Sequence, residues 1–219
     1  MVWIKICGIT GREDAKVVTD MGADCLGFIF STDSPRRIEL GQAREIVDAV
    51  RNIPKAGVFV NEKIGKILKY INVLGLDYVQ LSGDEDISYI RELKQEISEV
   101  KIVKALRLKK DESRDSNKAI EKLLKYADHI LLDSFDKYKY GGTGKTIDWE
   151  GIKGLIEPER LIVSGGLYHG NVSRALEVLR PFGADASSRL EESPGKKDLD
   201  KVQRFIKKVR FFEEQDKGK

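Results

Sequence analysis

A cysteine and an aspartate stand where their side chains could carry out proton transfer. Cys7 closes the apolar run VWIKIC, and Asp133 closes the run DHILLD. A thiolate can act as a base, and a carboxyl group at the rim of an apolar cavity has a raised pKa, as a general acid requires. The alternatives are a small buried hydrophobe for the cysteine and a cap or loop residue for the aspartate. We take the two residues as a candidate base and acid.

The neighbours of Cys7 bear on its ionisation. Alternation along a strand puts Trp3, Lys5 and Cys7 on one face. A free thiol with a pKa of about 8.5 is only slightly ionised at neutral pH, so a nearby Lys5 cation would favour the base. Lys5 could instead pair with Asp185. Cys25 begins the next apolar run and is expected about 15 Å from Cys7, at the opposite end of the sheet, with both thiols free.

Small residues after two later apolar runs predict a phosphate site. Gly165 and Gly166 follow the run RLIVS, and Ser187 and Ser188 follow GADAS. Backbone N–H groups in such loops are open to an anion, and a short helix within 188–193 would point its N-terminus at the same place. Ordinary turn residues are the alternative interpretation. A phosphorylated small molecule is the ligand that these loops predict.

Three further polar features carry weaker signals. Arg36 has a guanidinium that matches a carboxylate, although a surface arginine is the alternative. The glycine-rich segment 141–146 is not a nucleotide-binding P-loop, because Lys139 stands where the first glycine is needed, and a substrate-contacting lid remains. His129 and His169 are isolated, so no metal site is predicted.

Strands and helices must alternate strictly to position these residues. Short β-branched apolar runs recur, each followed by apolar positions at helical spacing. The predicted strands are 2–7, 25–30, 55–60, 76–81, 100–105, 128–133, 160–164 and 183–187. The predicted helices lie near 12–21, 41–52, 63–73, 86–97, 114–126, 148–155, 169–179 and 198–210. Eight such units predict an α/β fold, a single-domain (β/α)8 TIM barrel over 1–219, with its chemistry at the carboxyl ends of the strands.

Local signals refine the element boundaries. Thr10 precedes the acidic pair Glu13 and Asp14, and Asp86 precedes ISYIREL, so both are expected near helix starts. The charged tail, about 212–219, is expected to fray.

Composition excludes several classes of function. Lys and Arg number 39 against 36 Asp and Glu, and this near balance argues against a nucleic-acid partner. No apolar run reaches the roughly 18 residues that span a bilayer, and no signal-peptide pattern opens the chain. A soluble cytoplasmic protein without a membrane partner is therefore predicted, and a homodimer is left open.

Several ordered motifs together resemble the phosphoribosylanthranilate isomerase family. The resemblance runs over about residues 3–198 and rests most on the KICGIT opening and on the GGTGKTxDW segment. The segments are Lys5-Ile6-Cys7-Gly8-Ile9-Thr10, Ser34-Pro35-Arg36, Gly57-Val58-Phe59-Val60, Val79-Gln80-Leu81, Leu132-Asp133, 141–146 with Asp148-Trp149, Ser164-Gly165-Gly166-Leu167 and Pro194-Gly195-Lys196-Lys197-Asp198.

The resemblance implies a cofactor-free Amadori rearrangement of N-(5-phosphoribosyl)anthranilate in tryptophan biosynthesis. Asp133 would protonate the ring oxygen, and Cys7 would take the proton from the second sugar carbon. Arg36 would hold the anthranilate carboxylate, and the loops at 165–166 and 187–188 would hold the phosphate.

Two departures and two rival interpretations accompany the resemblance. Ser82 stands where the family usually has His, and Arg189 stands where it usually has Gly, which would be strained if its φ were positive. Another phosphosugar barrel, such as indole-glycerol-phosphate synthase or a pentose-phosphate epimerase, would bring a lysine-centred site or metal-binding histidines. A non-catalytic barrel would bind phosphorylated ligands without turnover.

Overall fold

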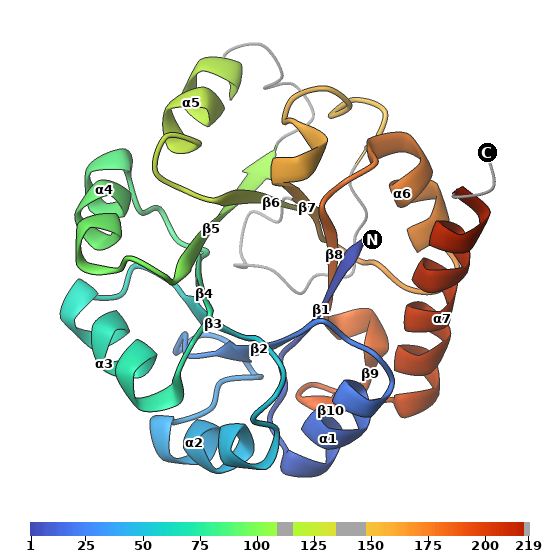
Figure 1. Ribbon diagram of the computed structural model, residues 1–219, viewed down its shortest axis with the longest axis horizontal. Coiled ribbons are helices and arrows are strands. Elements are labelled where there is room, and N and C mark those ends of the chain that lie inside the picture. Colours follow the sequence, from blue (N-terminus) through green and yellow to red (C-terminus); the bar gives the residue numbers. More distant parts are fainter. Residues whose placement is uncertain (109–115, 135–147, 217–219) are drawn as a thin grey trace.

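Eight parallel strands close into a barrel in the order β1 to β8, and β8 pairs with β1. The computed structural model describes residues 1–108, 116–134 and 148–216. Figure 1 shows the strands at the centre, ringed by helices. The strands are β1 Trp3–Cys7, β2 Cys25–Ile29, β3 Lys55–Phe59, β4 Tyr78–Leu81, β5 Lys101–Leu108, β6 His129–Ser134, β7 Leu161–Val163 and β8 Gly183–Ala186. The predicted (β/α)8 barrel is confirmed, and each predicted strand has its counterpart.

The helices follow the predicted alternation with one exception. They are α1 Arg12–Asp20, α2 Leu40–Ala49, α3 Ile64–Leu74, α4 Ile87–Glu96, α5 Ser116–Leu123, α6 Val172–Leu179 and α7 Leu199–Asp216, with 3-10 turns η1 Pro158–Arg160 and η2 Ser188–Leu190. The helix predicted over 148–155 is wrong, because this stretch forms turns. It contains Gly151 and Gly154, and Gly154 has a φ of +80°, which interrupts a helix. No helix in the described ranges has the length and apolar character to cross a membrane.

The predicted helix boundaries are partly confirmed. Asp86 caps α4, since its side chain accepts a hydrogen bond of 2.8 Å from the backbone N–H of Tyr89. Thr10 lies two residues before α1, as expected, but it does not cap the helix: Gly11 is the N-cap, and the Thr10 hydroxyl donates to the carbonyl of Gly195 at 2.5 Å.

The C-terminal helix α7 continues through residues that the sequence predicts to fray, as far as Asp216. Its last turns are held from elsewhere in the chain. Glu213 accepts from the backbone N–H of Val2, and Arg180 pairs with Asp216. These contacts between distant segments explain why the charge of the tail does not unravel it.

The two faces of the strands separate two apolar clusters. Ile4 and Ile6 belong to the large cluster between the barrel and its helices, whereas Trp3 packs on the smaller cluster inside the barrel. The predicted facing of β1 is therefore confirmed. The inner cluster consists of Cys25, Ala56, Tyr78, Val103, Leu131 and Ile162, with Trp3, Ala105 and Phe182 against it.

The register of β1 and β2 corrects the placement of Cys25. In the parallel register of these strands, Lys5 is opposite Cys25 and Cys7 is opposite Gly27. Along the barrel axis, Cys25 therefore lies only two residues from the level of Cys7. The expected position at the opposite end of the sheet is wrong, because closing a barrel staggers neighbouring strands along its axis. Both thiols are free, as predicted, and both are buried.

The hairpin β9 Glu191–Ser193 and β10 Lys196–Lys197 follows η2 and lies beside α1 in Figure 1. The backbone N–H of Lys197 donates to the buried carboxylate of Asp14 in α1 at 2.9 Å. The hairpin is therefore tied to the first βα unit of the barrel.

Candidate active site

Cys7 ends β1 on the face that points into the barrel, and its side chain is 5% exposed. Below it on the same face, the ammonium of Lys5 lies 3.0 Å from Asp185 of β8. The predicted pairing of Lys5 with Asp185 is thus present. Burial raises the pKa of the Cys7 thiol; the charge of Lys5 opposes this rise and is outweighed. The thiol is therefore held mostly neutral near pH 7.

Gly27 of β2 provides the space that the Cys7 side chain occupies. A methyl group at Gly27 would lie 2.7 Å from Sγ of Cys7 and 2.9 Å from its Cα. Contacts this short force the thiol or the strand to move. The glycine is therefore a steric requirement of the Cys7 position.

Replacing Gly27 with alanine is expected to lower kcat by about 10²-fold, because the methyl group displaces the thiol by a large fraction of an ångström. The same crowding is expected to reduce the free energy of unfolding by about 1 to 3 kcal/mol. Steady-state kinetics and thermal unfolding measure the two effects. Gly41→Ala in α2 is the matched control, since a methyl group there meets nothing within 4 Å. A folded Gly27→Ala protein with near wild-type kcat would contradict this role for Gly27.

Asp133 lies near the carboxyl end of β6 and is half-buried. Its neighbour two residues earlier, Leu131, belongs to the cluster inside the barrel, so alternation directs Asp133 to the interior as well. In the sheet register its partner on β5 is Arg107. Arg107 was missed from the sequence, although the alternation of Val103, Ala105 and Arg107 along one strand face could have indicated it.

The barrel order brings the candidate base and acid to one mouth. Two strands, β7 and β8, separate β1 from β6 around the ring. Cys7 and Asp133 both face inward at the carboxyl ends of their strands, where the chemistry of such barrels is found.

The loops after β7 and β8 have the backbone that the predicted phosphate site needs. Gly165 and Gly166 have φ values of +86° and +63°, in the region that favours glycine. Asn171 holds the bend, because its side-chain amide donates to the carbonyl of Gly166 at 3.0 Å. After β8, Ser188 begins the 3-10 turn η2, and Oγ of Ser187 is buried without a hydrogen bond to any residue that the structure describes.

A close approach at Gly8 brings the site residues together. A methyl group at Gly8 would lie 2.7 Å from Cδ of Arg36 and 3.0 Å from Oγ of Ser187. The turn directly after Cys7 therefore lies against both the arginine and the serine. The candidate base, the arginine expected to bind a carboxylate and the loop after β8 are thus close together at the barrel mouth.

Arg36 is not a surface arginine, since it is only 9% exposed. Its Nε and Nη2 atoms each donate to the carboxylate of Glu191 at 2.8 Å. Burial would raise the pKa of Glu191, but Arg36 and Lys197 lower it below its ordinary value. Within the described residues Nη1 of Arg36 has no hydrogen-bond partner, so this edge of the guanidinium remains for a further anion.

No role was predicted for Glu191 or Lys197 from the sequence, although Lys197 belongs to the Pro194–Asp198 motif of the family resemblance. Each stands in a like-charged pair, Glu191-Glu192 and Lys196-Lys197, which indicates solvated surface charge. In the structure one member of each pair is exposed, whereas Glu191 and Lys197 are buried. Their burial depends on how the β9–β10 hairpin docks, which no local pattern encodes.

A second buried ion pair shapes the loop after β4. Nζ of Lys104 donates to Glu85 and to the carbonyl of Gly83, both at 2.7 Å. Glu85 also accepts from the backbone N–H of Asn61 at 2.8 Å. This pair joins the loops that follow β3 and β4.

Both departures from the family pattern fit the structure without backbone strain. Arg189 does not have a positive φ, so its backbone is not strained by the side chain, and its guanidinium lies 5.6 Å from the centre of the Tyr168 ring. Ser82 accepts a hydrogen bond from the side-chain amide of Gln80 at 3.0 Å. The glycine-rich segment 141–146 lies outside the described residues.

His129 lies at the amino end of β6, far along the strand from Asp133. Its ring stacks on Phe182 with centroids 4.2 Å apart, and burial lowers the pKa of His129 to about 4. The structure therefore assigns this histidine to packing at the closed end of the barrel.

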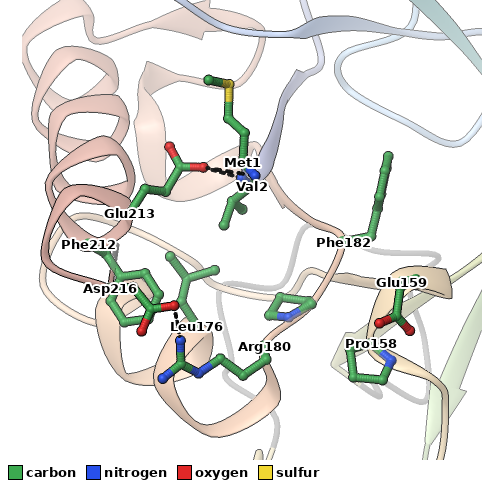
Figure 2. Close-up of a pocket in the computed structure, with 11 residues that line it drawn as sticks. Met1, Val2, Pro158, Glu159, Leu176, Arg180, Phe182, Phe212, Glu213 and Asp216 are labelled. Carbon is green, nitrogen blue, oxygen red and sulfur yellow. Dashed lines mark hydrogen bonds and ion pairs between the residues drawn. The ribbon is translucent and has the colours of Figure 1, made fainter. Parts of the chain in front are cut away.

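A cavity of about 430 Å³ is lined by residues at the amino ends of β1, β7 and β8 (Figure 2). Cys7 lies at the other, carboxyl end of β1. Two ion pairs stand at the wall of the cavity, Glu213 with the amino terminus of Met1 and Arg180 with Asp216, and Glu213 also accepts from the backbone N–H of Val2. This cavity lies at the end of the barrel that normally serves stability rather than chemistry.

The closed (β/α)8 architecture defines the chain as a TIM-barrel protein, with an inward thiol and an inward carboxyl at the carboxyl end of the barrel. A family model described as N-(5'phosphoribosyl)anthranilate (PRA) isomerase matches residues 4–208. The chain belongs to this family, and the resemblance found in the sequence is confirmed.

Individual relatives agree with the family assignment. The N-(5'-phosphoribosyl)anthranilate isomerase of Rubrobacter xylanophilus is 43% identical over 209 residues, which cover 94% of this chain and 98% of the relative. That of Aquifex aeolicus is 41% identical, covering 96% and 99% of the two chains. A crystal structure of the Thermotoga maritima enzyme is 38% identical, has a TM-score of 0.82 and covers 96% of this chain and 100% of its own.

Proposed function

We propose that the chain converts N-(5-phosphoribosyl)anthranilate to 1-(2-carboxyphenylamino)-1-deoxyribulose 5-phosphate, an Amadori rearrangement in tryptophan biosynthesis. The observation that carries the proposal is the placement of Cys7 and Asp133 at one barrel mouth in a member of this isomerase family. A solved family structure, 36% identical with a TM-score of 0.79, holds reduced 1-(o-carboxyphenylamino)-1-deoxyribulose 5-phosphate. A ligand of this kind presents a carboxylate, a sugar and a phosphate to the site.

Asp133 serves as the general acid in the first step. It gives a proton to the ring oxygen as the bond between that oxygen and the first sugar carbon breaks, while the nitrogen lone pair forms a C=N bond. The open-chain iminium ion then has an acidic proton on the second carbon. The position of Asp133 on β6, three strands from β1, suits it to act on one side of the sugar.

Cys7 serves as the base in the second step. Its thiolate removes the proton from the second carbon, and the electrons of that C–H bond neutralise the iminium nitrogen to give an enol amine. Tautomerisation of the enol to the ketone completes the rearrangement with no net gain or loss of atoms. The chemistry needs no cofactor.

The substrate anions are assigned to two flanking groups of residues. The free Nη1 edge of Arg36 would hold the anthranilate carboxylate, since its other edge is bound to Glu191. The phosphate would lie between Gly165 and Gly166 on one side and Ser187 and Ser188 on the other. The Ser187 hydroxyl, which is buried without a hydrogen bond to any described residue, would donate to it.

Turnover of the synthetic conjugate tests the proposed function. The anthranilate fluorescence of the phosphoribosyl conjugate is expected to fall with time in the presence of the purified chain, in proportion to enzyme concentration. Product is identified by its open-chain ketone, at an unchanged molecular mass. Binding of the conjugate without turnover would overturn the proposal and favour a non-catalytic phosphate-binding barrel.

We also propose that the chain forms a homodimer in the cytoplasm. A Thermotoga maritima relative, 37% identical, is described as dimeric. Met1 and Phe211 are exposed apolar residues that a second copy could cover, at 91% and 50% exposure. The free thiols Cys7 and Cys25 suit a reducing compartment. Light scattering is expected to give twice the chain mass, and a monomer at micromolar concentration would contradict the dimer.

A further inference from the structure

A chain of buried charges connects Arg36 to the backbone of Cys7. Arg36 donates twice to Glu191, and Nζ of Lys197 donates to the same carboxylate at 2.8 Å. The ammonium of Lys197 also donates to the carbonyl oxygen of Cys7 at 2.6 Å. The candidate base and the candidate carboxylate ligand are thus joined by one continuous set of hydrogen bonds.

The members of this set are almost removed from water. Side-chain exposure is 10% for Arg36, 3% for Glu191 and 0% for Lys197. Taking charges out of water is costly, and well-packed apolar residues often replace such pairs without loss of stability. A contribution to stability alone is therefore a weak explanation for this arrangement.

The anchoring of the hairpin makes the set rigid. The backbone N–H of Lys197 is held by Asp14 of α1, and Lys201 of α7 donates to the carbonyl of Glu191 at 3.0 Å. The backbones of Glu191 and Lys197 are thus bonded to α7 and α1, while their side chains bond Arg36 and the end of β1. An arginine bound on two of its nitrogen atoms by such a carboxylate keeps few of its rotamers.

We propose that Glu191 and Lys197 are positioning residues for the isomerisation, holding the guanidinium of Arg36 and the end of β1 at Cys7 in one geometry. Neither touches the reacting atoms in this assignment. Glu191 presents the Nη1 edge of Arg36 to the substrate carboxylate. Lys197 holds the peptide group from which the thiol extends. The inference rests on the proposed function, because the groups that it positions are those assigned to the substrate and to the base.

Glu191→Gln is the first test. It keeps the size of the side chain and removes the charge that orients Arg36, so KM is expected to rise about 10-fold while kcat changes less than about 3-fold. Arg36→Met is expected to raise KM at least as much. The double variant is expected to resemble Arg36→Met alone, because Glu191 acts through the arginine. The role of Glu191 would be overturned if the KM increases of the two single variants multiplied in the double variant, or if Glu191→Gln left KM unchanged.

Lys197→Met is the second test. It removes the bond to the Cys7 carbonyl, so kcat is expected to fall about 10-fold or more as the thiol loses its alignment. The Cys7 thiol also faces Lys5, Asp185 and Cys25. Removing the Lys197 cation raises the pKa of Cys7 further, so the increase of kcat with pH is expected to begin at a higher pH. A folded Lys197→Met protein with wild-type kcat and pH profile would overturn the role of Lys197.

A charge pair at the amino end of the barrel, Asp24 and Arg210, supplies the controls. Nη2 of Arg210 donates to Asp24 at 2.6 Å, and its Nη1 donates to the carbonyl of Val2, just before β1, at 2.8 Å, so this pair also joins a carboxylate to the backbone of the first strand. Asp24→Asn and Arg210→Met are expected to lower the Tm but to leave KM and kcat within about 2-fold, because this end of the barrel lies away from the proposed site. Equal kinetic losses in the two sets would show a general effect of destabilisation and overturn the inference.

Two safeguards keep the outcome decisive. Circular dichroism establishes that each variant is folded, and Glu191→Asp, which keeps the charge and withdraws it by one methylene, replaces Glu191→Gln if that variant does not fold. Glu191→Asp is expected to raise KM about 5-fold through the same loss of orientation. Wild-type protein without turnover would overturn the proposed function itself, whereas active wild type with kinetically silent variants would overturn only the positioning roles.

Discussion

Replacing Cys7 with serine is expected to lower kcat by about 10³-fold, because a hydroxyl group is far too weakly acidic to supply the base that removes the proton from carbon. The substitution changes one atom in a side chain that is 5% exposed, so the fold is expected to persist. KM is expected to change little, since Arg36 and the phosphate loops remain in place. The loss of anthranilate fluorescence, followed at saturating substrate, measures the effect.

The pH dependence of the wild type follows from the same assignment. Burial raises the pKa of Cys7, so the thiolate is scarce at neutral pH and its fraction grows with increasing pH. We therefore expect kcat to rise on the alkaline side of neutrality, by about 10-fold per pH unit where the thiol titration alone limits the rate. In Cys7→Ser this rise is expected to disappear.

Cys25 provides the matched control for Cys7. Cys25→Ser is the same substitution at a buried thiol on the neighbouring strand. Cys25 is opposite Lys5 in the strand register and belongs to the apolar cluster inside the barrel. It is expected to reduce the free energy of unfolding by about 1 to 3 kcal/mol, through burial of a hydroxyl group, and to leave kcat within about 3-fold. If Cys7→Ser were no slower than Cys25→Ser, the thiol of Cys7 would not be the base.

Replacing Asp133 with asparagine is expected to lower kcat by about 10²- to 10⁴-fold, because the amide is nearly isosteric with the carboxyl group but cannot give a proton to the ring oxygen. The defect lies in ring opening, the step before the thiol acts. A substrate analogue that is already an open-chain aldose imine is therefore expected to recover much of the lost rate in Asp133→Asn but not in Cys7→Ser. Rapid-mixing kinetics with the two substrates separates the steps.

Asp128 is the matched control for Asp133. It directly precedes the other end of β6, where its carboxylate pairs with Lys94 at 2.8 Å. Asp128→Asn is expected to lower the Tm slightly and to leave kcat unchanged, because this end of the barrel lies away from the substrate. Full activity in Asp133→Asn would mean that another residue supplies the proton. Arg107, the register partner of Asp133 on β5, was not predicted to lie beside this carboxylate.

Proteins with this fold divide their stability and their chemistry between the two ends of the barrel, and the site proposed for this chain follows that division. The amino end contains His129 stacked on Phe182 and the paired charges around the cavity of Figure 2. The carboxyl end contains Cys7, Asp133 and the glycine turns. Variants at the amino end are thus the natural source of controls for function.

The sequence by itself determined the eight strands, the facing of β1 and the placement of Cys7 and Asp133 at strand ends. These features follow from alternation and helical spacing, which act over a few residues and are written locally in the chain. The one helix predicted wrongly, 148–155, failed for a local reason as well, since Gly154 takes up a positive φ.

The tertiary structure alone decided the level of Cys25, the burial of Arg36 and the network of Glu191 and Lys197. Cys25 lies beside Lys5 because closure of the barrel staggers its strands, a property of the whole ring. Arg36 and Glu191 stand 155 residues apart, and their bond depends on the docking of the β9–β10 hairpin against α1. Charged residues buried by such long-range contacts have the same local pattern as solvated ones, so only the folded chain distinguishes them.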